Sequence, residues 1–165
     1  MKQDRFLIGI LAAICLLVVL SLILFLVRKD TQAYLPEAAP DSAPEQIVNN
    51  YVLALQQSDY ARAFRYLAEK QYKPTYEQFR RSFFNNQLDV HGTGVRIGTP
   101  EISGQEAFIE VTVIHSAGDP FSREWNTTET AVLVSQAEGW RISQMPYPYW
   151  GWDWYQPTSE PLKVP

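Results

Sequence analysis

The chain has 165 residues, and its 18 acidic against 14 basic residues give it a formal net charge of −4. No group of basic residues is larger than the Arg80–Arg81 pair, whereas a phosphate-binding surface needs many positive contacts, so the composition argues against nucleic acid as a partner. The one cysteine, Cys15, lies in an apolar stretch, so packing without disulfides must hold the rest of the chain together.

An uncharged stretch, residues 6–27, is the most informative feature of the sequence. At about 1.5 Å per residue, a helix of this length reaches about 33 Å, close to the roughly 30 Å hydrocarbon thickness of a bilayer. The stretch is longer than the apolar region of a cleaved signal peptide, which has about 7–15 residues. We therefore predict a transmembrane helix over residues 6–27 that makes the protein single-pass and acts as a signal anchor.

The segments on either side of this helix define the expected topology. Residues 1–5 are a short cytoplasmic lead, and residues 28–43, rich in Pro, Ala and Asp, are an extended stalk or linker. Basic residues flank both ends of the helix equally, so the positive-inside rule does not settle the orientation. The short lead and the acidic remainder favour an extracytoplasmic C-terminal domain, and we expect a bacterial plasma membrane.

Helical periodicity begins directly after the stalk. Pro44 can open a first helix that runs to about residue 57, with Ser42 as its cap. Ser58 or Asp59 caps a second helix. The apolar residues of this second helix share one face: Tyr60, Ala63, Phe64 and Leu67.

A third short helix is predicted from a capping box, in which Thr75 is followed three residues later by Gln78. From Val90 onward the apolar period shortens to two, and β-branched residues replace leucine, as is typical of an antiparallel meander. In the second strand, residues 109, 111 and 113 face one side and residues 108, 110 and 112 the other. Four strands are expected, over residues 95–99, 106–115, 122–135 and 140–144.

The helical run from Pro44 to Phe84, with LQQSDYARAFRYLAEK and PTYEQF, resembles the nuclear transport factor 2-like superfamily. It is similar to membrane-tethered extracytoplasmic members, such as the N-terminal domain of penicillin-binding transpeptidases, and the closing GWRI of the last strand matches them. The resemblance implies an α+β cone over residues 44–145, with two to three helices packed on a curved antiparallel four-stranded sheet. It indicates the fold and leaves the activity open.

The resemblance also implies that inward residues of the first helix and of the long strands would line the cone. Aromatic candidates for this lining are Tyr51, Tyr66, Phe83, Phe108, Trp125 and Trp140. Because aromatic residues most often bury themselves for core packing, we favour a filled cone over an open pocket. A small apolar ligand would require the open form.

Catalytic residue types are scarce outside the membrane stretch. His91 lies in a glycine-rich turn, His115 ends a strand, and the two have no spacing that suggests a metal or nucleophile site. Asp59, Asp89 and Asp119 fall in predicted loops and do not match the buried acid of ketosteroid isomerase relatives. The sequence therefore predicts no catalytic residue, no metal site and no cofactor, and the chain is not expected to be an enzyme.

Residues 146–165 form an aromatic and proline-rich tail, with six aromatic rings between positions 147 and 155. These are Tyr147, Tyr149, Trp150, Trp152, Trp154 and Tyr155. They could stack on sugar rings, sit at a lipid interface, or fold back over the domain, and we favour the last.

We therefore expect a membrane-anchored binding or assembly module whose partner is an unidentified protein, glycan or small apolar ligand. A homodimer through the sheet face is also possible on this pattern. Two alternatives stay open: an envelope-glycan binder that uses the tail, and a small-molecule enzyme that uses the cone.

Overall fold

A computed structural model describes residues 10–11, 14–21, 23, 43–115 and 125–157 of the chain. The chain divides into two units, Met1–Ala33 and Tyr34–Pro165. In the first unit, residues 14–21 are helical and their side chains are exposed. None of the helices in the described ranges is both long enough and apolar enough to cross a bilayer. Much of the predicted span, and the stalk up to residue 42, lies outside those ranges.

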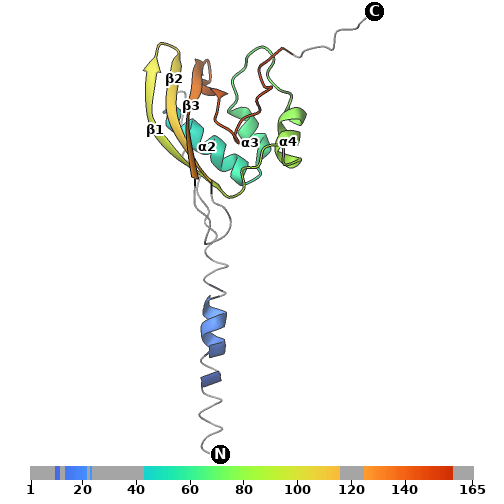
Figure 1. The fold of residues 1–165 in the computed structure, drawn as a ribbon, viewed down its shortest axis with the longest axis vertical. Coiled ribbons are helices and arrows are strands. Elements are labelled where there is room, and N and C mark those ends of the chain that lie inside the picture. The colour runs from blue at the N-terminus through green and yellow to red at the C-terminus, as the bar shows by residue number, and fades with distance from the viewer. Residues whose placement is uncertain (1–9, 12–13, 22, 24–42, 116–124, 158–165) are drawn as a thin grey trace, which may run out of the picture. The chain divides into compact units, whose positions relative to one another are not determined.

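The second unit is an α+β domain in which three helices precede a four-stranded sheet (Figure 1). The helices are α2 (Pro44–Gln56), α3 (Tyr60–Arg65) and α4 (Tyr76–Phe84). The strands are β1 (Thr93–Ser103), β2 (Glu106–His115), β3 (Trp125–Gln136) and β4 (Gly139–Gln144). All neighbouring strands are antiparallel and follow the order β1-β2-β3-β4, which confirms the predicted meander.

The local chemistry explains where the helices begin. Pro44 occupies the first turn of α2, where its fixed φ suits a helix and its missing N–H is not needed. The Asp59 carboxylate accepts a hydrogen bond from the Arg62 amide at the start of α3. The predicted capping box is confirmed at α4, where Thr75 and Gln78 satisfy each other's backbone amides.

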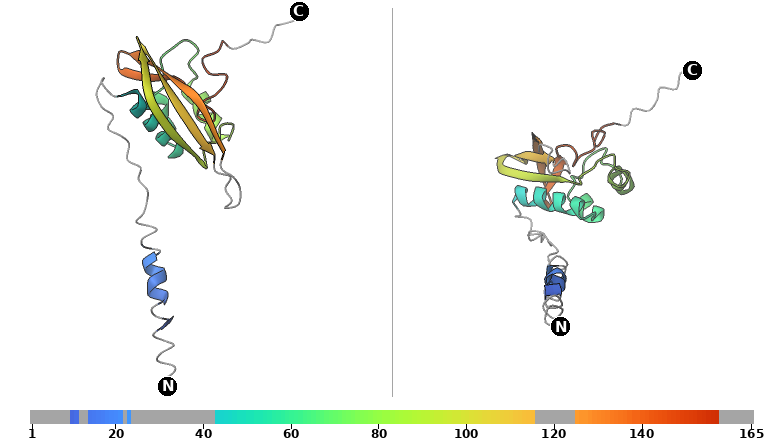
Figure 2. Two further views of the ribbon diagram at one scale, coloured as in Figure 1. Left: turned by 60° about the vertical axis from the view of Figure 1, so that its left-hand side comes forward. Right: turned by 60° about the horizontal axis from the view of Figure 1, so that its bottom comes forward.

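The sheet curves over α2 (Figure 2). Successive side chains of a strand point to opposite faces of the sheet, so every second side chain faces the helices. Ile109, Val111 and Val113 of β2 point toward the helices and are fully buried, which confirms that the strand alternates with a period of two. Phe108 lies on the opposite face at the register of Glu101, half-buried, so it does not line the cone as expected. The cone is therefore packed from one face of the sheet only.

Three predicted boundaries were wrong. The cap of α2 is Ala43, which makes no side-chain cap bond, and Ser42 lies outside the described residues. Strand β1 begins at Thr93 and extends to Ser103, past a register shift between Ile97 and Pro100. The strand continues through Pro100 because a proline, which cannot donate to the ladder, fits at an irregularity on an edge strand.

Helix α3 ends at Arg65, earlier than its apolar face suggested, because the chain turns to pair with the sheet. Leu67 forms a parallel bridge with Ile142 of β4. The Ala68 amide donates to the Ile142 carbonyl at 2.8 Å, and the Ile142 amide donates to the Tyr66 carbonyl at 2.7 Å. This short extended segment covers the edge of β4, whose backbone groups would otherwise be unpaired.

Candidate functional site

The C-terminal segment, residues 145–157, folds back onto the domain. Its path is set by two tight turns, in which the Tyr149 amide donates to the Pro146 carbonyl at 2.9 Å and the Trp154 amide donates to the Gly151 carbonyl at 3.2 Å. The turns send alternate rings to opposite sides. Tyr149 is fully buried and Trp154 is 6% exposed, whereas Trp152 is 83% exposed. The segment is thus part of the hydrophobic core as well as of the surface.

Tyr149 lies between α2 and the start of β1. Its hydroxyl is 2.7 Å from Thr93 Oγ1 and 3.4 Å from Gln56 Nε2. Its backbone carbonyl accepts a hydrogen bond of 2.7 Å from the hydroxyl of Tyr51, which is itself fully buried. Tyr149 therefore joins the C-terminal segment to α2 and to the start of β1 through buried and part-buried hydrogen bonds.

Trp154 packs on the inner face of α4. Its ring centroid lies 5.2 Å from that of Phe79 and 6.0 Å from that of Phe83, the two apolar residues on this helix face. Gly151 makes this possible, because a Cβ at that position would overlap the Trp154 indole. Trp150 adds an edge contact to Trp154 with centroids 5.0 Å apart.

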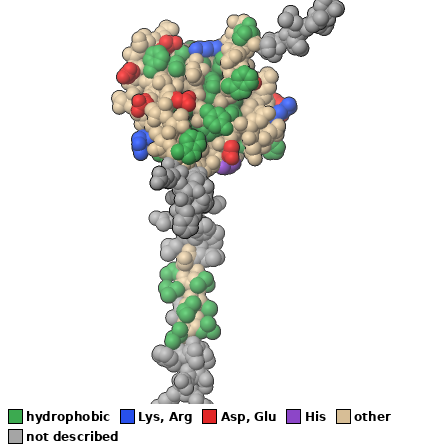
Figure 3. Space-filling model, viewed as in Figure 1, with side chains coloured by type: hydrophobic (Ala, Val, Ile, Leu, Met, Phe, Trp, Pro, Cys, Tyr) green, Lys and Arg blue, Asp and Glu red, His purple; other side chains and the backbone are tan. Residues whose placement is uncertain are grey.

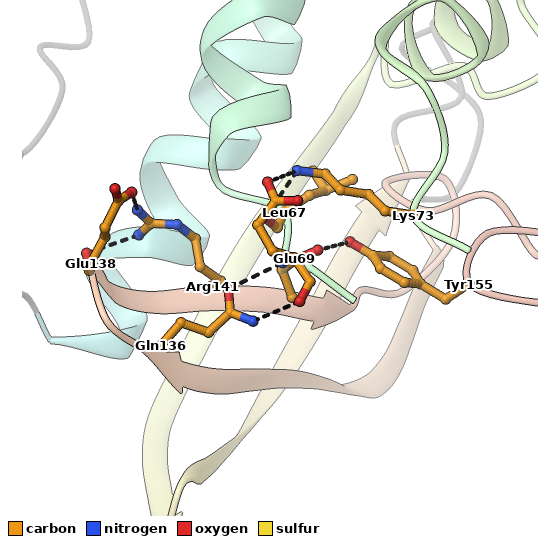
Figure 4. A network of polar contacts seen from close by, with 8 residues as sticks. Leu67, Glu69, Lys73, Gln136, Glu138, Arg141 and Tyr155 are labelled. Carbon is orange, nitrogen blue, oxygen red and sulfur yellow. Dashed lines mark hydrogen bonds and ion pairs between the residues drawn. The ribbon is translucent and has the colours of Figure 1, made fainter. Parts of the chain in front are cut away.

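Tyr155 ties the segment to the loop between α3 and α4 (Figure 4). Its hydroxyl donates to the Ala68 carbonyl at 2.6 Å, and its amide donates to the Tyr72 carbonyl at 3.1 Å. The same loop is held to the sheet by Gln136, whose side chain exchanges two hydrogen bonds with the Glu69 backbone, at 3.1 and 3.0 Å. Trp150 stacks on Tyr155 at an interplanar angle of 7°.

Burial changes the acidity of the three tyrosines that anchor this arrangement. Desolvation raises the pKa of Tyr51 well above its usual value, with smaller contributions from the Tyr155 and Tyr149 charges. Desolvation also raises the pKa of Tyr149, although the hydrogen bond that its hydroxyl accepts from Gln56 acts in the opposite direction. Burial, with a smaller contribution from Glu69, raises the pKa of Tyr155. All three are neutral phenols at physiological pH.

Other aromatic rings on this part of the domain face outward. Figure 3 shows hydrophobic side chains scattered over the visible face of the domain. Five exposed aromatic residues lie on α4, in the loop before it and in the C-terminal segment, and we call them the outer aromatic group: Tyr72 (50% exposed), Tyr76 (41%), Phe84 (70%), Tyr147 (59%) and Trp152 (83%). Tyr76 and Phe84 flank Arg80 at spacings of four along α4, and the Arg80 guanidinium lies 5.8 Å from the Phe84 centroid.

Charge on this side differs from that of the rest of the domain. Six basic residues lie between Tyr60 and Phe84 against the acids Glu69 and Glu77: Arg62, Arg65, Lys70, Lys73, Arg80 and Arg81. In the other described parts of the domain, acidic residues outnumber Arg96 and Arg141. The outer aromatic group therefore lies beside a locally basic segment on an acidic domain.

The remaining sequence-predicted site residues are dispersed. Tyr66 is 6% exposed in the core and Trp140 is half-buried against it. Trp125 lies at the far end of β3, where it is 56% exposed and stacks on His115 with centroids 3.6 Å apart. The structure thus brings together the rings of the C-terminal segment with Tyr51, and leaves Trp125 outside this assembly.

Within the described ranges, no group of three or more His, Cys, Asp and Glu side chains could hold a metal ion. His91 is exposed in the turn before β1, and the His115 ring stacks on Trp125. The acidic groups Glu69, Glu77 and Glu138 form ion pairs with neighbouring Lys or Arg side chains. What this part of the molecule offers is aromatic surface and basic charge.

Sequence reasoning missed the residues that receive the tail. Thr93 and Gln56 contact the Tyr149 hydroxyl, and the Ala68 carbonyl accepts from Tyr155. The apolar stripe with Phe79 and Phe83 did signal that α4 needs a covering surface, but nothing in the pattern identified Trp154 as that cover. A backbone carbonyl such as that of Ala68 leaves no signal in sequence.

No protein-family model matches the sequence, and no curated protein matches it closely enough to indicate a relationship. Comparison with solved structures does give matches. Two of the neighbours are described as nuclear transport factor 2-like proteins.

The three neighbours described next all have TM-scores below one half. A candidate ketosteroid isomerase from Shewanella frigidimarina has a TM-score of 0.47 at 23% identity, covering 63% of this chain and 93% of its own. A nuclear transport factor 2-like protein of unknown function from Shewanella oneidensis has 0.44 at 10% identity, covering 59% and 89%. A candidate nuclear transport factor 2-like transpeptidase from Campylobacter jejuni has 0.41 at 16% identity, covering 61% and 97%.

Proposed function

We propose that this chain is a single-pass membrane protein whose extracytoplasmic domain acts by binding or assembly, with the outer aromatic group as its contact surface. The observation that carries the proposal is the division of the C-terminal rings. Tyr149 and Trp154 fill the interior of the domain, while Trp152 and Tyr147 are held outward by the same turns. Because the interior is filled and these two rings are exposed, binding at the surface is favoured over catalysis in the interior.

The energetics of the outer rings support the same conclusion. The apolar surface of Trp152 is exposed to water and would be buried when a partner binds. Clusters of exposed apolar residues commonly mark interaction sites. Aromatic residues and Arg are also the residue types that dominate binding hot spots. Arg80 and Phe84 lie beside each other on α4 and supply both.

The anchor in this proposal rests on the uncharged stretch, residues 6–27, whose length suits a bilayer. Residues 30–43 of the stalk would let the domain reach a partner up to about 40 Å from the membrane if they are extended at about 3.1 Å per residue. The partner would then be another envelope component. A partner of this kind, protein or glycan, matches the expected extracytoplasmic location.

One observation favours a glycan as the second candidate. Trp152 and Tyr147 present ring faces that could stack on sugars, as aromatic side chains do in other polar–apolar contacts. An enzyme of the cone would instead require an open interior with a carboxylate or histidine at its floor. In the described part of the domain, that interior holds Tyr51, Tyr149 and Leu133, each fully buried.

Site-specific photo-crosslinking in cells tests the proposal. A benzophenone side chain is placed at position 152 or 84, and at position 101 as a matched control, since Glu101 is exposed on β1 and lies outside the outer aromatic group. We expect adducts from positions 152 and 84 in washed membranes and none from position 101. The mass and enzyme sensitivity of the adduct distinguish a protein partner from a glycan.

Two results of this experiment would contradict the proposal. Equal adducts from all three positions would mean that the outer aromatic group has no special role. Recovery of the full chain in the soluble fraction would remove the anchor.

A further inference from the structure

The hydroxyl of Tyr149 has a complete and directional set of partners. The Thr93 hydroxyl donates its only proton to the Val90 carbonyl at 2.7 Å, so toward Tyr149 its oxygen can only accept. The Tyr149 hydroxyl must then be the donor in the 2.7 Å contact with Thr93, which leaves its own lone pairs to accept from Gln56 Nε2 at 3.4 Å. One donated and one accepted bond are what a phenol can form, and a bare aromatic ring can form neither.

The partners of this phenol belong to elements far from it in sequence. Gln56 is the last residue of α2, and Thr93 is the first residue of β1. Gln56 Nε2 also donates to the Thr93 backbone carbonyl at 3.1 Å, which joins these two elements without help from the C-terminal segment. The two side chains that contact the Tyr149 hydroxyl are therefore held in place by their own contact. We call Gln56 and Thr93 the phenol cradle.

The backbone of Tyr149 makes hydrogen bonds that are separate from those of its side chain. The Tyr149 amide is satisfied within its own turn by the Pro146 carbonyl, and its carbonyl receives one bond from Tyr51. The ring itself is fully buried and belongs to the hydrophobic core. Removing only the side chain would leave an apolar cavity with two polar groups at one end, and apolar cavities of this kind bind small aromatic molecules.

We infer that the phenol cradle is a binding site for small phenols, which this chain fills with its own Tyr149. The C-terminal segment acts as a ligand held in cis. A free phenol can enter only where the ring of residue 149 is absent or has withdrawn. The inference concerns the interior and is independent of the outer aromatic group, so it can fail while the proposed function stands, and the reverse.

The test uses the full chain with Tyr149→Ala in detergent micelles, titrated with 4-methylphenol and, separately, with toluene. The two molecules have nearly the same shape and differ in the hydroxyl. Because the hydroxyl can form one short hydrogen bond to Thr93 and one longer bond from Gln56, we expect 4-methylphenol to bind about tenfold more tightly than toluene and to raise the unfolding midpoint of the variant. The unsubstituted chain and Tyr149→Phe, whose rings still fill the cradle, are expected to show no saturable binding.

Two further measurements keep the inference falsifiable. If Tyr149→Ala alone is unfolded, 4-methylphenol is expected to restore the cooperative transition, and a variant that stays unfolded at saturating 4-methylphenol overturns the inference. Adding Thr93→Val to Tyr149→Ala is expected to abolish the preference for 4-methylphenol over toluene. Equal affinity of Tyr149→Ala for the two molecules, or no saturable binding of either, overturns it as well.

Discussion

Replacement of Trp154 by alanine is expected to lower the free energy of unfolding of the domain by about 3–5 kcal/mol, the usual cost of removing a large buried aromatic ring. The side chain is 6% exposed and contacts Phe79, Phe83 and Trp150. The variant would lose this contact area and leave a cavity beneath α4. Urea unfolding of the full chain in micelles measures the change.

The matched control for this experiment is Trp152→Ala, two residues away on the same turn. Because Trp152 is 83% exposed, its removal is expected to change the free energy of unfolding by no more than about 0.5 kcal/mol. Both variants lose one tryptophan from the same short segment, so a difference in their stability reports the packing of Trp154 and not the loss of a tryptophan as such. If both variants were equally stable, the segment would not be packed as described.

High pH is expected to destabilise the domain through its buried tyrosines. In the unfolded chain a tyrosine titrates near pH 10, whereas burial raises the pKa of Tyr51, Tyr149 and Tyr155 in the folded state. Their contribution to stability is therefore fully present below about pH 10. It is lost as pH rises from there toward the folded pKa values, because the unfolded state releases protons first.

The slope of this loss is up to about 1.4 kcal/mol per pH unit for each fully buried tyrosine, and less for Tyr155, which is partly reached by solvent. Urea unfolding at a series of pH values above 9, with tyrosinate absorbance followed in parallel, measures it. Tyr149→Phe is expected to reduce the slope of the unfolding free energy against pH by the contribution of one buried tyrosine. Tyr147→Phe, at a 59% exposed position, should leave this slope unchanged. Identical slopes in both variants would contradict the burial of Tyr149.

The elements with strong local signals could be predicted from the sequence. The capping box at Thr75 indicated the start of α4, and the alternation through Ile109 and Val111 indicated strand β2, but not which of its two faces is buried. These features depend on residues a few positions apart, so they are visible in a linear pattern. The order of the strands followed because short turns join antiparallel neighbours.

The site could be predicted only in part, because its contacts are long-range. The tail was expected to fold back, but its period-free sequence did not say which rings would point inward. Tyr149 meets Thr93 and Gln56 across gaps of 56 and 93 residues, through a hydroxyl and an amide that look ordinary in the sequence. The division between Trp154 inside and Trp152 outside depends on the turn at Gly151.

The central claim is that the C-terminal segment is a folded part of the domain, and hydrogen exchange on the full chain tests it most directly. The Tyr155 amide donates to the Tyr72 carbonyl, and the Ala68 amide donates to Ile142 in the sheet. If the segment is folded with the core, the Tyr155 amide exchanges slowly, within about tenfold of the Ala68 amide. Exchange of Tyr155 at the rate of an unstructured peptide, while Ala68 stays protected, would contradict the account.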